Sequence, residues 1–222
     1  MRHELKTVIT KGDYYELNSR LGPLFSTDSH ADAHGEYRVR SLYFDSPFDS
    51  ALQDKKNGVP RREKFRIRLY NNDCSFIRLE KKIKINNLYK KVSVPVSQEQ
   101  VALLLCGEKK WMLESENSLI QELYAKMTTK LLRPQVVVEY LRRAYVFSPG
   151  NVRLTLDRSI QSCSEKNSFL DGRLPLAHAG EEYAVLEVKY DSFLPDIVRS
   201  AVSLPGRYTS AFSKYAFSRR FG

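Results

Sequence analysis

The 222-residue sequence predicts an α+β fold that is mainly antiparallel β, with the sheet closed into a tunnel and short helices on its flanks. Two observations predict this fold. Apolar and polar residues alternate with a period of two through much of the chain, as in strands with one buried face. Turn residues and short helical patterns separate these segments, and no linker, repeat or low-complexity stretch divides the chain. We therefore expect a single domain over residues 1–222.

The expected strands are rich in β-branched and aromatic residues and end at turn residues. Asp45-Ser46-Pro47 closes one strand, and Asn86-Asn87 joins two others as a tight turn. The strands are expected at residues 2–9, 36–44, 62–70, 75–85, 88–96, 135–147, 151–158 and 183–190.

The expected helices carry start and stop signals. Ser97 with Gln100 three residues later is typical of a capping box, and Pro134 ends the helix before it. The helices are expected at residues 11–24, 48–56, 97–105, 118–132 and 195–204. The polar, turn-rich segment 162–180 is expected to be a mobile loop at one mouth of the tunnel.

The composition indicates a soluble protein with an anionic partner. Hydrophobic residues make up 42% of the chain and charged residues 28%, which is ordinary for a globular protein. The formal net charge is +10 and the sequence pI is about 9.5. A positive excess of this size favours nucleic acid, an anionic membrane surface or a phosphorylated small molecule as the partner.

The sequence also excludes several classes of protein. No stretch approaches the roughly 20 apolar residues of a membrane span, and the N-terminus lacks the apolar core of a secretion signal. Cys74, Cys106 and Cys163 are widely spaced and suit neither a disulfide framework nor a zinc site. We expect a cytoplasmic protein, with peripheral attachment to the inner face of the membrane as an alternative.

The most informative pattern is the row of charges on one face of each strand. Arg62, Lys64, Arg66 and Arg68 occupy every second position, so their side chains point to the same face. The next strand repeats the pattern, and other strands place Glu and Lys residues two apart in the same way. These further rows contain Arg2, Glu4 and Lys6; Arg78, Glu80, Lys82 and Lys84; Tyr140 and Arg142; Arg153, Thr155 and Asp157; and Glu187 and Lys189.

Two interpretations compete for these rows. For a single strand, a charged face in water is the simpler one. For the whole set, a tunnel lumen is favoured, because four like charges in a row repel one another unless an anion lies among them. A cationic lumen suits an extended polyphosphate, whose phosphates accept bidentate Arg contacts and Lys charges. Nucleic-acid binding is not expected, since few aromatic residues are interleaved with the basic ones.

Six motifs in order carry a resemblance to a known family. They are Arg2-His3-Glu4-Leu5-Lys6, Ser41-Leu42-Tyr43-Phe44-Asp45, Lys64-Phe65-Arg66-Ile67-Arg68-Leu69-Tyr70, Leu79-Glu80-Lys81-Lys82, Leu186-Glu187-Val188-Lys189-Tyr190 and Phe212-Ser213-Lys214-Tyr215. Over nearly the whole chain the sequence resembles the catalytic domain of the vacuolar transporter chaperone (VTC) family, the polyphosphate polymerases, within the triphosphate tunnel metalloenzyme superfamily. It resembles the compact bacterial members.

This resemblance implies a closed eight-stranded tunnel in which the γ-phosphoryl group of ATP passes to a polyphosphate chain with Mg²⁺ or Mn²⁺. The implied catalytic residues are Arg66, Arg68, Arg142, Lys82 and Lys214. The phosphate-binding residues are Lys6, Lys90, Tyr140, Arg153 and Ser213, and alternation adds Arg62, Lys64 and Lys189. The resemblance implies Glu187 as the metal ligand, and alternation adds Glu4 and Glu80.

Two positions depart from related patterns. Arg2 stands where tunnel hydrolases carry the first Glu of an ExExK motif, which argues against the triphosphatase and cyclase branches. Ala211 stands where the VTC family usually has a basic residue, and Arg207 is a nearby candidate to replace it. The alternatives to a polymerase are a hydrolase of tripolyphosphate or nucleoside triphosphates, and a non-catalytic sensor of polyphosphate or nucleotides that signals to a separate membrane protein.

Overall fold

The computed structural model describes residues 2–86, 88–172, 174–175, 177–178 and 183–219. Its centre is an antiparallel sheet in which eight strands follow the order β1-β10-β8-β7-β3-β4-β5-β6. These strands are β1 (His3–Thr10), β3 (Glu36–Asp45), β4 (Arg61–Tyr70), β5 (Asp73–Ile85), β6 (Leu88–Val96), β7 (Arg133–Phe147), β8 (Val152–Cys163) and β10 (Tyr183–Tyr190). The short strands β2 (Ser26–Thr27) and β9 (Ala177–His178) pair with β7 and β8. All the strands that alternation predicts are thus confirmed.

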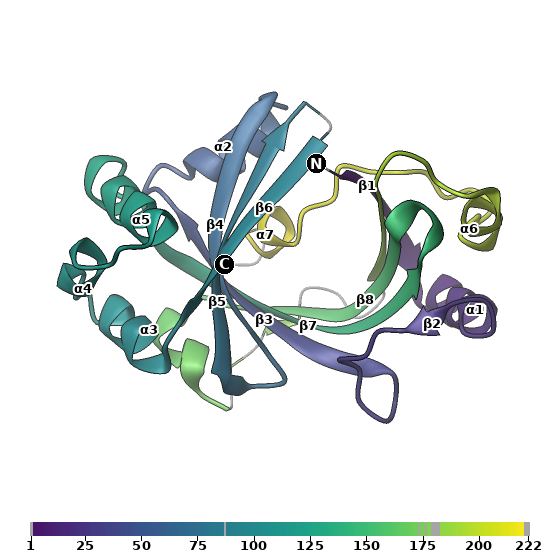
Figure 1. Ribbon diagram of the computed structural model, residues 1–222, viewed down its shortest axis with the longest axis horizontal. Helices are drawn as coiled ribbons and strands as arrows, with labels where there is room; N and C mark the ends of the chain where they lie inside the picture. The colour runs from purple at the N-terminus through teal and green to yellow at the C-terminus, as the bar shows by residue number, and fades with distance from the viewer. Residues whose placement is uncertain (1, 87, 173, 176, 179–182, 220–222) are drawn as a thin grey trace.

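The sheet coils, so that β1 and β6, the two ends of the strand order, approach one another (Figure 1). Among the described residues these strands form no ladder, and one isolated bridge joins Arg2 to Tyr89 through N···O distances of 3.1 and 3.2 Å. The prediction of a closed tunnel is therefore wrong in one respect, because the strand ladders do not close the sheet. Alternation shows which face of a strand is buried, but it does not determine whether two edge strands pair.

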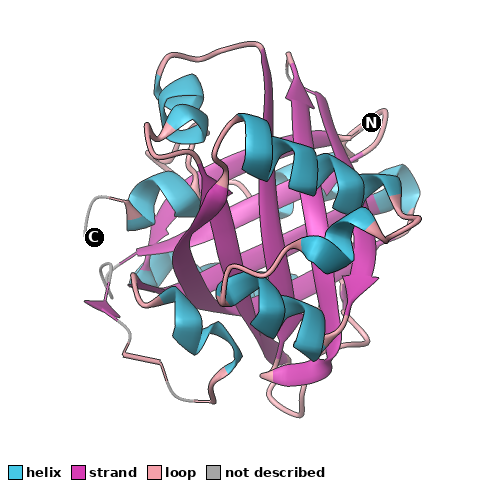
Figure 2. Ribbon diagram, turned by 90° about the vertical axis from the view of Figure 1, so that its left-hand side faces the viewer, coloured by secondary structure: helices cyan, strands magenta, loops and turns pink. Residues whose placement is uncertain are grey.

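Helices α3 (Gln98–Leu105), α4 (Lys110–Leu113) and α5 (Ser118–Thr129) cover the outer face of one half of the sheet (Figure 2). The 3₁₀ helix η2 (Lys166–Leu170) packs beside them. Together they bury the outward side chains of β4 and β5, including Phe65, Ile67 and Leu79. The apolar half of each alternating strand therefore lies under helices, and the charged half faces the inside of the coil.

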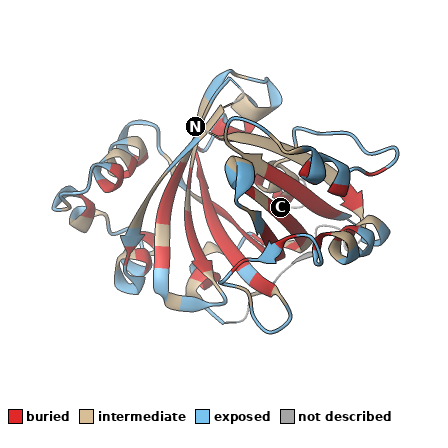
Figure 3. Ribbon diagram, turned by 45° about the vertical axis from the view of Figure 1, so that its right-hand side comes forward, coloured by how far each residue is buried: buried red, intermediate tan, exposed pale blue. Residues whose placement is uncertain are grey.

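Helices α1 (Lys11–Leu21) and α6 (Asp196–Ala201) cover the outer face of the other half, over β1, β8 and β10. Thr10 begins α1 with a capping box: its hydroxyl accepts from the backbone N of Asp13 at 3.2 Å, and the Asp13 carboxylate accepts from the backbone N of Thr10 at 2.9 Å. No helix in the described part of the chain combines the length and the apolar character needed to cross a membrane. Figure 3 shows that burial is concentrated along the strands between the two helical layers.

Two short helices lie at the inner side of the coil. α2 (Ser50–Lys56) follows β3, and α7 (Lys214–Ser218) lies between β4–β6 and β8 (Figure 1). Tyr215 of α7 is buried against Tyr43 of β3, with ring centroids 5.4 Å apart. The sequence did not predict α7, because five residues are too few to show a helical period.

Segment 162–180 is the main correction to the expected elements. Ser162 and Cys163 continue β8, and Phe169 of η2 is fully buried in the core beneath α3. The guanidinium of Arg40, itself buried, donates to the carbonyl oxygens of Phe169 (3.0 Å) and Asp171 (2.5 Å). The prediction of a mobile loop is therefore wrong for residues 162–171, and residues 173, 176 and 179–182 lie outside the described residues.

Candidate functional site

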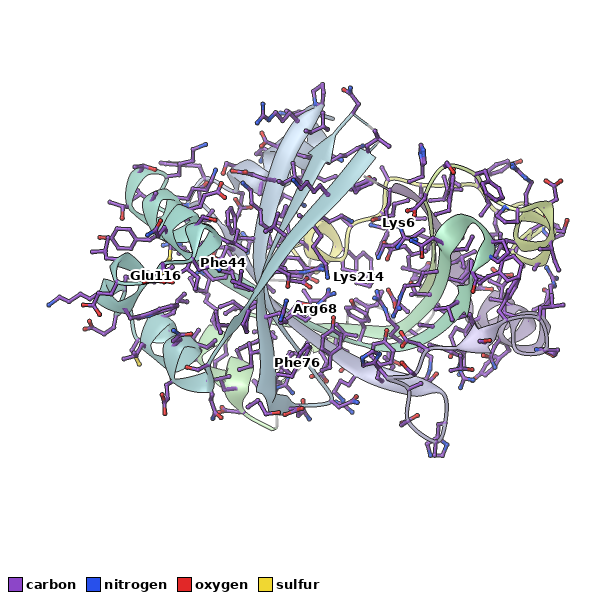
Figure 4. The ribbon with its side chains drawn as sticks, in the orientation of Figure 1. Lys6, Phe44, Arg68, Phe76, Glu116 and Lys214 are labelled. Atoms are coloured by element: carbon purple, nitrogen blue, oxygen red, sulfur yellow. The ribbon has the colours of Figure 1, made fainter. Side chains whose placement is uncertain are left out.

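The charged rows of the strands meet on the inner face of the coil, because directly opposed residues of an antiparallel ladder share a face. Across β1, β10 and β8, Lys6 lies opposite Glu187, which lies opposite Thr155. Other inner pairs are Arg142 with Asp157, Arg66 with Glu80, Lys64 with Lys82, and Ser41 with Arg68. Figure 4 shows Lys6, Arg68 and Lys214 within the coil, and Phe44 on the helix-covered side.

Two cavities lie along this inner face. The larger has a volume of about 1030 Å³, and its described lining contains nine Lys or Arg residues and three Asp or Glu residues, among them Arg66, Arg68, Arg142, Arg153 and Lys189. The smaller has a volume of about 510 Å³ and is lined by six Lys or Arg residues and one carboxylate, that of Glu4. Both cavities contact Glu4 and Lys82, so the two spaces adjoin at this ion pair. Their excess of cations favours a polyanionic ligand.

Glu80 organises the cations of β4 and β6. One carboxylate oxygen accepts from Arg66 at 2.6 and 2.7 Å and lies 3.8 Å from Arg68, and the other accepts from Lys91 at 2.9 Å. Burial alone would raise the pKa of Glu80, but Arg66, Arg68 and Lys91 outweigh it and hold the pKa well below its usual value. Glu80 is therefore ionised at neutral pH and fixes three cations at the wall of the larger cavity.

Asp157 organises a second group at β7, β8 and α7. Arg142 binds its carboxylate in a bidentate manner at 2.6 and 2.8 Å, and the ammonium of Lys214 lies 2.5 Å from Oδ2. All three side chains are buried. Burial opposes ionisation, yet Arg142 and Lys214 lower the pKa of Asp157 to about 2. The carboxylate is thus a permanent anchor for two cations.

A third group combines Glu4 and Glu187 with three lysines. Lys82 donates to both oxygens of Glu4 at 2.6 and 2.8 Å, and Lys6 lies 2.7 Å from the same carboxylate. Lys189 lies 3.2 Å from Glu187. Burial alone would raise the pKa of both carboxyl groups, but the surrounding lysines outweigh it and lower both, that of Glu187 strongly.

In this third group three lysine ammonium groups share only two carboxylates, so one lysine loses its proton more readily than the others. Burial and the neighbouring charge of Lys6 lower the pKa of Lys82 to about 7. Lys64 at the smaller cavity behaves similarly: burial lowers its pKa to about 8.

Tyrosine hydroxyls complete the inner wall. Tyr140 accepts from Arg68 at 3.2 Å and from Arg142 at 3.3 Å, so it links the Glu80 and Asp157 groups. Tyr43 accepts from Arg66 at 3.3 Å, and Tyr37 accepts from Arg153 at 2.9 Å. Burial raises the pKa of Tyr140 to about 12, whereas in Tyr43 the guanidinium groups of Arg66 and Arg68 outweigh burial and lower the pKa to about 8. These phenols hold the arginine side chains in place.

The predicted site residues mostly gather at the two cavities. Arg62, Lys64 and Ser213 line the smaller one, and Ser213 also caps α7 by accepting from the backbone N of Ala216 at 3.4 Å. Lys90 lies at the rim of the larger cavity but opposes Ile83, which places it on the outer face of the sheet. Its neighbour Lys91 opposes Lys82 and points inward.

Sequence reasoning missed several inner residues. Alternation placed Asp157 in a row with Arg153, but Asp157 was not assigned to the site. Lys91 and Tyr37 gave no distinct signal, and Tyr43 stood in one of the six motifs without an assigned role. Ala211 lines the smaller cavity, whereas Arg207 contacts Asp13 of α1 at 2.7 Å. Arg207 is thus not among the described residues that line either cavity, and it does not replace a basic side chain at Ala211.

The carboxylates also test whether a divalent metal would fit. Within the described residues, no group of three or more His, Cys, Asp or Glu side chains could hold a metal ion. Mg²⁺ in phosphate sites often takes only one or two carboxylates, with phosphate oxygens and water as the other ligands. Glu187 meets that need, and beside it the buried hydroxyl of Thr155 has no hydrogen-bond partner in the described structure. Glu187 and Thr155 are therefore the described donors that could join phosphate oxygens around a metal, although neither of them lines the two cavities.

Comparisons with known proteins agree with this fold. No curated protein matches the chain. Among solved structures, an adenylate cyclase-like protein from Bacillus halodurans is 14% identical, with a TM-score of 0.55 over 90% of this chain and 85% of that chain. A protein from Pyrococcus horikoshii is 16% identical (TM-score 0.46, 91% and 85% covered), and the mimivirus capping enzyme triphosphatase is 11% identical (TM-score 0.38, 89% and 85% covered). At 14% identity and a TM-score of 0.55, the likeness to the Bacillus halodurans protein concerns the fold alone.

The family comparison covers almost the entire sequence. The model of the VTC domain matches residues 1–221, a range that contains every strand and both cavities described above. The resemblance carried by the six sequence motifs is thereby confirmed. The chain belongs to the VTC domain family.

Proposed function

We propose that this protein is an ATP-dependent polyphosphate polymerase that transfers the γ-phosphoryl group of ATP to a polyphosphate chain on the inner face of the coiled sheet. Membership of the VTC family and a fold shared with triphosphate tunnel proteins support a phosphate-directed activity. The observation that carries the finer proposal is the pair of cationic cavities that share Glu4 and Lys82 in their linings. Two adjoining cavities allow a nucleotide and a chain to be held end to end.

The inner cations are suited to phosphoryl transfer, which depends on positioning and on neutralising charge on the transferred group. Arg66 and Arg142 are fixed by Glu80 and Asp157 at distances of 2.6–2.8 Å, and Arg68 is held by the hydroxyls of Ser41 at 3.0 Å and Tyr140 at 3.2 Å. Each guanidinium keeps donors that its carboxylate does not use, and these can take phosphate oxygens. Lys82 and Lys214 add point charges beside these arginines.

In this proposal Glu187 and Thr155 hold Mg²⁺ or Mn²⁺ together with a phosphate of the substrate. The metal supplies charge neutralisation and Lewis-acid polarisation of the phosphoryl oxygens. Lys189 and Lys6 compensate the Glu187 carboxylate in the absence of a ligand. The proposed partners are ATP and polyphosphate rather than nucleic acid, because the cations lie inside the coiled sheet.

The test is ³¹P NMR of the protein with ATP and Mn²⁺, with and without a short polyphosphate primer. We expect internal-phosphate signals to grow as ADP appears, and the Arg66→Ala/Arg68→Ala variant to remain folded and lose this activity. A Lys109→Ala/Lys110→Ala variant at α4 removes the same charge from the outer layer and should retain activity. ADP and orthophosphate without internal-phosphate signals would instead identify a hydrolase, and binding without turnover would identify a sensor.

A further inference from the structure

The motif Ser41-Leu42-Tyr43-Phe44-Asp45 sends alternate side chains of β3 to the inner face, where each one contacts a different part of the site. Ser41 accepts from Nε of Arg68 at 3.0 Å, and Tyr43 accepts from Arg66 at 3.3 Å. Asp45, the last residue of the strand, accepts from the hydroxyl of Tyr215 at 2.6 Å. The first two contacts hold phosphate-binding arginines, whereas the third reaches α7 from the other end of the chain.

Asp45 is a fully buried carboxylate whose oxygens are all engaged. It accepts from the backbone N of Ser46 and of Ala51, both at 2.8 Å, and of Leu52 at 3.1 Å, which fixes the start of α2. The Tyr215 hydroxyl completes this set. One side chain therefore ties the end of β3, the first turn of α2 and α7 to one another.

Tyr215 holds α7 in position through contacts of its ring and its hydroxyl. Its side chain is buried, its ring packs on Tyr43, and the ammonium of Lys64 lies 5.0 Å from the ring centroid. Burial, the hydrogen bond and the charge of Asp45 raise the pKa of Tyr215 well above its usual value, so the hydroxyl remains a donor throughout the physiological range. A helix of five residues has little stability of its own, so its position depends on such contacts.

Lys214, the residue before Tyr215, is the side chain whose place this contact determines. Its ammonium lies 2.5 Å from Asp157 and 4.7 Å from the centroid of the Tyr140 ring. It thus lies beside Arg142 on the inner face, although its backbone comes from a short helix outside the sheet ladders. The strands themselves do not fix α7 through backbone pairing, because none of its residues belongs to a strand.

We propose that Asp45 and Tyr215 are positioning residues, whose hydrogen bond locks α7 against the inner face and holds Lys214 beside Arg142 for phosphate binding. The role of Lys214 in this statement rests on the proposed function. The lock itself is a separate property of the fold, and the two can be tested separately.

The first test compares Tyr215→Phe with Tyr145→Phe. Tyr145 is also buried, and its hydroxyl donates to Asn18 at 2.7 Å on the outer side of the sheet, so each variant removes one buried tyrosine hydroxyl with its hydrogen bond. In native-state hydrogen exchange, we expect the amides of α7 to exchange about threefold to tenfold faster in Tyr215→Phe and unchanged in Tyr145→Phe. Unchanged α7 exchange in Tyr215→Phe, or equal acceleration in both variants, overturns the lock.

The second test measures tripolyphosphate affinity by calorimetry for the wild type, Tyr215→Phe, Lys214→Ala and the double variant. We expect Tyr215→Phe to weaken binding by about threefold to tenfold and to have no further effect once Lys214 is Ala. If the two substitutions weaken binding independently, so that their effects multiply in the double variant, Tyr215 does not position Lys214. Full affinity in Tyr215→Phe leads to the same conclusion, and neither result contradicts the proposed function. Absence of binding by the wild type contradicts the proposed function and, with it, the role of Lys214, whereas the exchange experiment still decides the lock.

Discussion

At the level of single residues, two buried carboxylates on the inner face are each shared between two or more cations. Glu80 binds Arg66 and Lys91, and Asp157 binds Arg142 and Lys214. A buried charge without partners costs several kcal/mol, so these carboxylates make the burial of the cations tolerable. Because the cations are already fixed, an incoming polyanion orders few side chains on binding, which favours affinity.

Glu187 gives the sharpest test of the proposed metal role. We expect Glu187→Gln to lower metal-dependent turnover by at least about tenfold, since a ligating carboxylate is lost. Metal-free tripolyphosphate binding should stay the same or tighten, because a negative charge is removed from among Lys6, Lys82 and Lys189. Steady-state kinetics with varied Mn²⁺ and calorimetry without metal separate the two effects. An equal loss of both would show that Glu187 acts through the fold of the site.

The ammonium group of Lys82 predicts a specific pH dependence of binding. Its pKa is about 7 in the free protein, because burial and Lys6 disfavour the charged form. A bound phosphate stabilises that form and raises the pKa, so binding above pH 7 takes up a proton and affinity falls as pH rises. Calorimetry in buffers of different ionisation enthalpy measures the uptake. In Lys82→Gln the uptake should be smaller than in the wild type, and equal uptake would assign the proton to another group.

The sequence was a good guide to single residues where alternation continued without interruption. Arg66, Arg68 and Lys82 lie where a period of two places them. Lys90 was displaced by one residue in favour of Lys91, because the register of β6 places Lys91 opposite Lys82 and a shift of one residue exchanges the two faces. The ion-pair partners of each cation could not be predicted, since they depend on which strands lie side by side.

At the level of elements, the helical layer over β4 and β5 stabilises the sheet without contacting the site. Leu123 of α5 is fully buried in this layer, so we expect Leu123→Ala to reduce the free energy of unfolding by about 2–5 kcal/mol. Leu113 of α4 is 57% exposed, and Leu113→Ala should change it by no more than about 0.5 kcal/mol. Urea denaturation checks both values.

Tripolyphosphate affinity of the folded Leu123→Ala protein should match that of the wild type. If the Leu123→Ala protein is fully folded and still binds tripolyphosphate more weakly, the outer helical layer influences the inner cavities. That result would contradict the view that the two faces of the sheet act independently.

Helices with capping residues or a regular apolar spacing were predictable from the sequence, and the two five-residue helices were not. α3 and α5 follow from capping residues and apolar spacing, and both are confirmed. α7 and η2 have five residues each, and their places depend on tertiary contacts with Asp45 and Arg40. The polar composition around Phe169 concealed a core residue, because one buried aromatic suffices to dock a segment.

At the level of the whole molecule, the coil of the sheet converts separate charged rows into a shared cationic interior. No single strand would hold a polyanion, since each row alone would face water. The coil brings β1 and β6 together at the Arg2–Tyr89 bridge and places Glu4 against Lys82 from β5. The number of charged rows in the sequence indicated a shared cationic interior. The incomplete closure of the sheet depends on the twist of the assembled strands, which cannot be predicted from the alternation of residues.

Two adjacent lysines on β5 show most clearly whether a polyanion binds the inner face of the sheet. Lys82 points inward to Glu4, and Lys81 points outward to Glu63 at 2.9 Å. Tripolyphosphate binding is measured by calorimetry below pH 7, where Lys82, with a pKa of about 7, is mostly protonated. We expect Lys82→Ala to weaken binding by at least about tenfold and Lys81→Ala by no more than about twofold, because only Lys82 gives up a charge-assisted contact with the ligand. Equal weakening in the two variants would contradict this expectation, because the ligand would then respond to net charge and not to the inner face.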